Sequence, residues 1–153
     1  MWEHIKDKES DMSWARNAMI NGTLIAVHDG SYDRERERVG VDTTLCTASR
    51  QTLRGSFYKI SPMAGSFRGE FLGLAVIHTL TLAVARFFHL DCVYEKICCD
   101  NIVALNQSSR VRQRVQVGIK HLDLHRTIRN LRCSTKMAFK YVHVRAHQDG
   151  IKP

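Results

Sequence analysis

The sequence predicts a mixed α/β fold, in which helices pack on a β-sheet. Three strand-like runs come first, and a long helical pattern follows them. A further strand-like run, helical patterns and a last strand-like run then complete the chain. This order is typical of a sheet covered by helices. With 153 residues, 44% apolar and 25% charged, the chain has the size and composition of one soluble globular domain.

The first 22 residues are expected to form a polar lead-in that is at most partly ordered. Many charged residues surround Trp2 and Trp14, and Asn21-Gly22 is a strong turn signal. The predicted domain therefore occupies residues 23–153.

The first half of that domain predicts a three-stranded meander. Residues 23–29 favour a buried strand, because residues 24–27 are apolar without alternation. Residues 39–45 alternate between apolar and polar side chains, and residues 52–60 are rich in Phe, Tyr, Leu and Thr. The charged run 33–38 suits an exposed hairpin tip between the first two strands.

A long helix is expected to start at Ser66, which could cap it, after a break at Ser61-Pro62. One face is apolar at helical spacing: Phe67, Phe71, Leu74, Ala75, His78, Leu82 and Ala85. Residues 71–85 contain no formal charge, which raises a membrane span as an alternative. A span requires about 20 apolar residues, and Arg86 interrupts this run. A buried core helix is therefore predicted, with no membrane partner.

The second half predicts a strand over residues 93–99 and a short helix over 102–108, which Asp100 or Asn101 would cap. A longer helix is predicted over 111–132, and a last strand over 137–146.

Three acidic residues lie at the ends of apolar elements. Asp29 ends the first predicted strand, Glu70 lies at the start of the long helix, and Asp100 ends the fourth strand. A buried charge is costly unless it is paired or binds a cation, so the pattern favours a divalent-metal site. Each residue also has an ordinary alternative. Asp29 could be a turn residue, Glu70 could complement the helix dipole, and Asp100 could be an N-cap.

Four motifs in this order carry a family resemblance: HDGSY at 28–32, FRGEFLGL at 67–74, CDN at 99–101 and VRAHQD at 144–149. Together they resemble the ribonuclease H domain of retroelement reverse transcriptases and of their degenerate genomic copies. The resemblance implies a five-stranded mixed sheet, with three antiparallel strands followed by parallel ones.

The same resemblance implies a site and an activity. Asp29, Glu70, Asp100 and His147 match the catalytic positions, and the three acids match the metal ligands. Two Mg²⁺ ions are expected, with Mn²⁺ as a possible substitute. The implied reaction is hydrolysis of the RNA strand of RNA–DNA hybrids.

One position of the family pattern has no match. The family carries a fourth acid on a final helix, roughly ten residues beyond the histidine, whereas this chain ends six residues after His147. Asp149 lies too close to His147 to take that place. We therefore expect a domain that is incomplete at its C-terminus, without the last helix, and has weakened activity. The alternative is a catalytically inactive relic that binds nucleic acid.

The net charge of +8 is unevenly distributed along the chain. Residues 1–100 hold 12 basic and 13 acidic side chains, whereas residues 101–153 hold 11 basic and 2 acidic ones. Such a basic block is typical of a polyanion binder, although a solvated basic face is the simpler alternative. The candidate nucleic-acid contacts are Arg112, Arg114, Lys120, Arg126 and Arg129.

Five cysteines, odd in number and without a CxxC pair, indicate reduced thiols rather than a disulfide framework. The polar start of the chain shows no signal-peptide pattern, so an intracellular location is expected, in the cytoplasm or nucleus. His143 and His147 have a zinc-finger spacing, but Cys98 and Cys99 are adjacent and 43 residues separate them from His143. Zinc is therefore not predicted as a ligand of this chain. The sequence does not indicate an oligomeric state.

Overall fold

The structure is a computed structural model that describes residues 4–7, 12–60, 65–110, 120–134 and 136–145. Its strands are β1 (His4–Asp7), β2 (Leu24–Asp33), β3 (Arg38–Cys46), β4 (Thr52–Ile60), β5 (Cys92–Cys99) and β6 (Lys136–His143). Its helices are α1 (Ser13–Asn21), α2 (Ser66–Phe87), α3 (Ile102–Ser109) and α4 (Leu122–Cys133).

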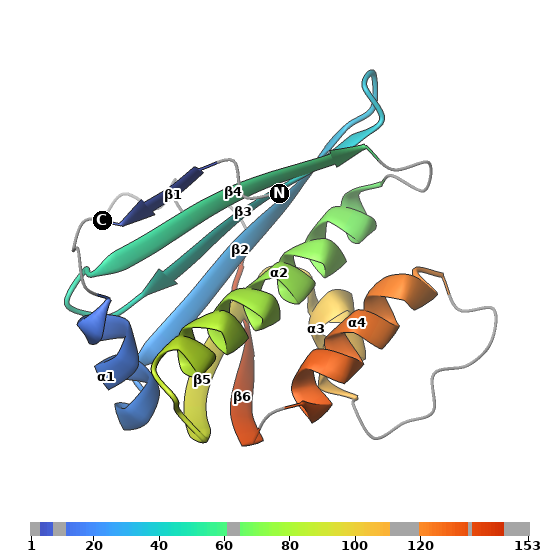
Figure 1. The fold of residues 1–153 in the computed structure, drawn as a ribbon. Coiled ribbons are helices and arrows are strands. Elements are labelled where there is room, and N and C mark those ends of the chain that lie inside the picture. Colours follow the sequence, from blue (N-terminus) through green and yellow to red (C-terminus); the bar gives the residue numbers. More distant parts are fainter. Residues whose placement is uncertain (1–3, 8–11, 61–64, 111–119, 135, 146–153) are drawn as a thin grey trace.

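The strands form one mixed sheet in the order β1-β4-β3-β2-β5-β6. The pairs β2–β3, β3–β4 and β1–β4 are antiparallel, and the pairs β2–β5 and β5–β6 are parallel. The five predicted strands and their mixed directions are confirmed. The short strand β1 extends the sheet at its β4 edge, which the sequence did not predict (Figure 1).

The N-terminal segment differs from the predicted lead-in, because α1 belongs to the core. Its side chains at positions 14, 15, 18 and 19 are buried in the same cluster as those of α2 and the sheet. This spacing places them on one face of a helix. The Asn21-Gly22 turn signal marks the end of α1, where Gly22 has φ +68° and its amide donates to the carbonyl of Ala18.

Helix α2 lies across one face of the sheet against β2 and β3, and α4 packs beside it (Figure 1). By length and composition alone its 22 residues could cross a membrane, with a mean hydropathy of 1.4 over the most apolar stretch. The fold buries 67% of that stretch, so the predicted core helix is confirmed. Its N-cap is Gly65, which makes no side-chain capping bond, so the predicted cap at Ser66 is wrong.

The C-terminal half follows the predicted order with shifted boundaries. The predicted cap at Asn101 is confirmed, because its side-chain oxygen accepts from the Ala104 amide at 3.0 Å. Helix α4 starts at Leu122; the stretch 111–119, where a helix was predicted, lies outside the described residues. Strand β6 ends at His143 and not at residue 146.

Candidate functional site

Glu70 is held against the end of β2 by a close approach of two backbones. The Gly30 amide donates to Oε1 of Glu70 at 3.3 Å. A Cβ at position 30 would lie 2.4 Å from the backbone nitrogen of Glu70, which no real side chain could tolerate. The glycine of HDGSY and the acid of FRGEF are thus linked by direct contact between strand and helix.

The parallel pairing of β2 and β5 brings two further carboxyl groups to the same edge of the sheet. Val27 of β2 pairs with Cys98 of β5. Asp29 and Asp100 each lie two residues beyond these paired residues. Asp29 is exposed, Asp100 is half-buried and Glu70 is buried. The structure therefore brings the three predicted acids together at one place. Their solvent exposure increases from Glu70 through Asp100 to Asp29.

The electrostatics of Glu70 confirm that these groups are neighbours. Burial is the largest effect that raises the pKa of Glu70 to about 7, and the charge of Asp100 is the next. The hydrogen bond from Gly30 lowers this pKa, and the charge of Asp29 raises it further. A divalent cation would relieve this repulsion, and carboxylate oxygens are the ligands that Mg²⁺ prefers. The residues present therefore fit the implied metal.

The sequence reasoning missed a further acidic residue beside Asp29, on the exposed face of the sheet. Asp42 of β3 pairs directly with Asp29 of β2, and both side chains are exposed. Residues opposite each other in an antiparallel pair share a face of the sheet. The Ser56 hydroxyl donates to Oδ1 of Asp42 at 2.5 Å. Asp42 could have been found from the sequence only with the register of the β2–β3 hairpin.

The end of β6 also contacts this edge. The ring of His143 donates from Nε2 to the backbone carbonyl of Asp100 at 2.9 Å. Val144 donates from its amide to the carbonyl of Cys99 at 3.0 Å. His147 and Asp149 lie outside the described residues, so the predicted role of His147 stays a prediction.

The basic candidates are divided between described and undescribed parts of the chain. Lys120, Arg126 and Arg129 are exposed on α4 or directly before it, whereas Arg112 and Arg114 lie outside the described residues. The buried side chain of Arg68 donates to both carboxylate oxygens of Asp123, at 3.1 and 2.5 Å.

This ion pair joins the first turn of α2, two residues before Glu70, to the first turn of α4. The start of the basic helix is therefore fixed beside the N-terminal end of α2, close in sequence to the buried acid. Arg132 has a different role, since its guanidinium lies 5.2 Å from the ring centroid of Tyr141 and donates to the Ser108 carbonyl.

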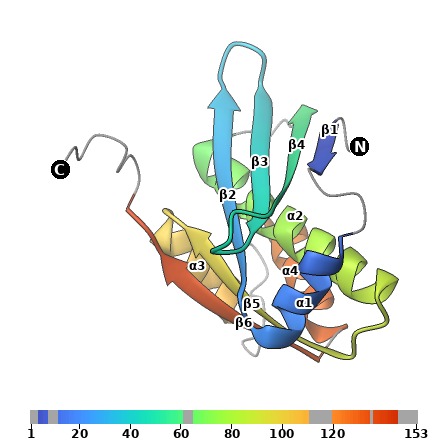
Figure 2. The same ribbon diagram turned by 90° about the vertical axis from the view of Figure 1, so that its left-hand side faces the viewer.

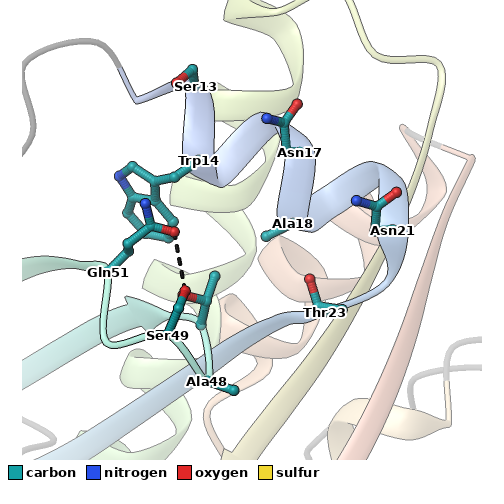
Figure 3. A pocket seen from close by; sticks show the side chains of 10 residues that line it. Ser13, Trp14, Asn17, Ala18, Asn21, Thr23, Ala48, Ser49 and Gln51 are labelled. Carbon is teal, nitrogen blue, oxygen red and sulfur yellow. Dashed lines mark hydrogen bonds between the residues drawn. The ribbon is translucent and has the colours of Figure 1, made fainter.

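An open cavity of about 450 Å³ lies elsewhere, between α1 and the turn that joins β3 to β4 (Figure 3). Its lining is about half polar and half apolar, and its polar residues include Asn17, Asn21 and Thr23, with Ser49 donating to Gln51 at 3.3 Å. Thr23 precedes β2, whereas Asp29 lies toward its other end, so this cavity is separate from the acidic edge.

No protein-family model and no curated protein matches the sequence. Solved structures do resemble the fold. Ribonuclease H1 from Halobacterium salinarum is 17% identical with a TM-score of 0.56, and the match covers 80% of this chain and 86% of that one.

Two further structures show the same likeness. The N-terminal ribonuclease H domain of a Mycobacterium tuberculosis protein is 17% identical, with coverages of 82% and 84% and a TM-score of 0.53. LC11-RNase H1, isolated from compost and solved in complex with an RNA/DNA hybrid, is 15% identical, with coverages of 83% and 88% and a TM-score of 0.63. At these identities the likeness shows the fold, and the chain has a ribonuclease H-like α/β fold.

Proposed function

We propose that this chain is a divalent-metal-dependent endonuclease that hydrolyses the RNA strand of RNA–DNA hybrids. The observation that carries the proposal is the convergence of Asp29, Glu70 and Asp100 at the shared edge of β2 and β5. They converge in a fold that ribonuclease H1 enzymes share. A neighbour solved with an RNA/DNA hybrid supports nucleic acid as the partner.

The three acids would hold Mg²⁺, or Mn²⁺ in its place. A pair of such ions activates a water molecule and stabilises the leaving oxygen of an in-line phosphodiester hydrolysis. Asp29, Glu70 and Asp100 would each supply a carboxylate ligand, and the bound metal would supply the activation of the attacking water. The Gly30 amide orients the Glu70 carboxylate for this task. His147 would assist proton transfer or product release.

The basic side chains of Lys120, Arg126 and Arg129 would bind the phosphate backbone. All three are exposed, and the Arg68–Asp123 pair ties α4 to the first turn of α2, two residues before Glu70. Phosphate binding by such residues releases counterions, so hybrid affinity should fall steeply with salt.

A second candidate is a non-cleaving protein that binds nucleic acid, which would be a retroelement relic. The observation in its favour is the basic excess of residues 101–153, which does not depend on the acidic edge. This candidate retains binding but gives no cleavage.

The test is incubation of the purified chain with an end-labelled RNA–DNA hybrid and Mg²⁺, with products resolved on a denaturing gel. Single-stranded RNA and duplex DNA serve as competing substrates. Asp29→Asn should abolish cleavage, whereas Asp91→Asn should retain it, because Asp91 is an exposed acid before the other end of β5. Intact hybrid with binding retained in the wild type would contradict the endonuclease and favour the second candidate.

A further inference from the structure

Three side chains with metal-binding atoms meet behind the acidic edge, on the α2 side of the sheet. They are His28, Glu70 and Cys99, and all three are buried. Nδ1 of His28 lies 3.5 Å from Oε2 of Glu70, and Sγ of Cys99 lies 3.9 Å from the same oxygen. His28 and Cys99 directly precede Asp29 and Asp100, and side chains alternate between the faces of a strand. The two clusters therefore share only Glu70.

The ring of His28 has no hydrogen-bond partner in the part of the chain that the structure describes. Its side chain is 0% exposed, and neither ring nitrogen is bonded. Burial is the main cause that lowers the pKa of His28 to about 4, so the ring is neutral near pH 7. An unpaired buried donor or acceptor destabilises the folded protein, and a ligand that pairs with it removes that cost. Nδ1 of His28 therefore faces the Glu70 carboxylate with a lone pair or an N–H that no described group satisfies.

The surroundings make room for this ring and keep the sulfur protonated until a metal binds. Burial raises the pKa of the Cys99 thiol to about 12, and only the hydrogen bond from Asn101 acts in the opposite direction. A Cβ at Gly73 would lie 2.4 Å from Nδ1 of His28, so α2 accommodates the imidazole only because position 73 is glycine. The Asn101 amide donates to Sγ of Cys99 at 3.2 Å. A hydrogen bond to the charged form of a group stabilises that form.

We propose that His28, Glu70 and Cys99 form a binding site for Zn²⁺ or another borderline-soft divalent cation. The imidazole nitrogen, carboxylate oxygen and thiolate are the donor types that zinc takes. Tetrahedral zinc with bonds of 2.0–2.3 Å separates its ligand atoms by about 3.3–3.7 Å. The three atoms here lie within 4.8 Å of one another, so small side-chain movements suffice.

Binding would release the Cys99 thiol proton to solvent, and water could fill the fourth position. This site differs from a zinc finger and uses neither of the histidines at 143 and 147. Because Glu70 belongs to both clusters, zinc bound here would compete with Mg²⁺ for that carboxylate. This consequence for activity rests on the proposed nuclease function, whereas the binding itself does not.

Titration of Co²⁺ into the reduced, metal-free chain tests the site, because cobalt reports its own ligands. We expect one equivalent to bind with a thiolate-to-cobalt charge-transfer band and tetrahedral ligand-field bands, and Zn²⁺ to displace both. Cys99→Ser should lose the charge-transfer band. Cys98→Ser is the matched control, since Cys98 is the adjacent buried cysteine of β5 and should leave the band unchanged.

Absence of a charge-transfer band in the wild type would overturn the proposal without any variant. A band that persists in Cys99→Ser, or that Cys98→Ser removes, would also overturn it. Circular dichroism of both variants checks the fold. His28→Leu retains the thiol but should weaken Co²⁺ binding at least tenfold. A chain that binds Co²⁺ through Cys99 but never cleaves a hybrid would refute only the nuclease.

Discussion

Two buried histidines of the same core differ in their hydrogen bonding. Burial is the main cause that lowers the pKa of both His28 and His78 to about 4. The ring of His78 contacts the Leu74 carbonyl at 2.6 Å and the Tyr141 hydroxyl at 2.8 Å. Among the described residues, neither nitrogen of His28 has such a partner. Burial alone therefore does not separate a structural histidine from a candidate ligand, whereas hydrogen-bond satisfaction does.

Two buried glutamates differ in another way, namely in the charges that lie near them. Burial raises the pKa of Glu95 to about 8, and its carboxylate accepts a hydrogen bond from the Thr81 hydroxyl at 2.8 Å. The pKa of Glu70 is raised to about 7 by burial together with the charges of Asp100 and Asp29. The repulsion between carboxylates marks Glu70 as the residue that a cation would stabilise, whereas Glu95 is neutral in the folded protein near pH 7.

The largest expected effect is on hybrid cleavage. Glu70→Gln should lower the cleavage rate by more than about 100-fold, since even the outer partners of metal ligands often contribute 10–100-fold. Glu95→Gln is the matched control, because it makes the same change from glutamate to glutamine at another buried position. It should retain the cleavage activity. Single-turnover rates at saturating Mg²⁺ measure both. Equal losses in the two variants would show that the effect comes from the core and not from metal binding.

The next largest expected effect is on how the free energy of unfolding depends on pH. Glu95 has a folded pKa above its unfolded value, so its contribution is complete below about pH 4.5 and is lost as the pH rises through about 8. Each pKa unit corresponds to about 1.4 kcal/mol. Glu95→Gln should therefore raise the free energy of unfolding relative to the wild type at pH 8.5, by on the order of 5 kcal/mol.

Urea denaturation at pH 5 and pH 8.5 measures this difference. The two histidines have lowered pKa values, so their contribution is lost as the pH falls from 6.5 through about 4 and does not affect the alkaline comparison. A stability difference between Glu95→Gln and wild type that is the same at both pH values would contradict a neutral Glu95.

The sequence predicted those features that depend on a single periodic pattern or on a single capping residue. The non-alternating run before Asp29, the apolar face of α2 and the cap at Asn101 depend on short stretches of chain. The order of these elements predicted the sheet. The three acids predicted for a site lie close together, but the predicted strand end at Asp29 is wrong, because β2 continues to Asp33.

The features that were missed depend on contacts between distant segments. Asp42 is a site neighbour only through the β2–β3 register, and the partners of His28 come from α2 and β5. In α1, charged neighbours in the sequence concealed an apolar face that is only apparent once a helix is assumed. Local patterns cannot reveal such pairings.

Replacing His28 or His78 by leucine tests the comparison of the two histidines through the free energy of unfolding. His78→Leu should lower the free energy of unfolding by about 1–3 kcal/mol, because it removes two hydrogen bonds and leaves the Tyr141 hydroxyl without its ring partner. His28→Leu should change it by less than about 1 kcal/mol, since no bond is lost and an unpaired polar ring is removed. Thermal and urea denaturation of both variants measure the difference. Larger destabilisation by His28→Leu would mean that His28 has an internal partner.

The smallest expected effect comes from the partner of His78. Tyr141→Phe removes one hydroxyl that bonds to Nε2 of His78 and keeps the aromatic ring, which Arg132 contacts from 5.2 Å. The loss should be about 1 kcal/mol, as for a typical single hydrogen bond. In a background that already carries His78→Leu, the same change should have almost no effect, because the bond is already absent. The non-additivity of this double-mutant cycle measures the bond itself. Full additivity would show that the two residues do not interact, and His78 would then resemble His28 in having an unpaired nitrogen within the core.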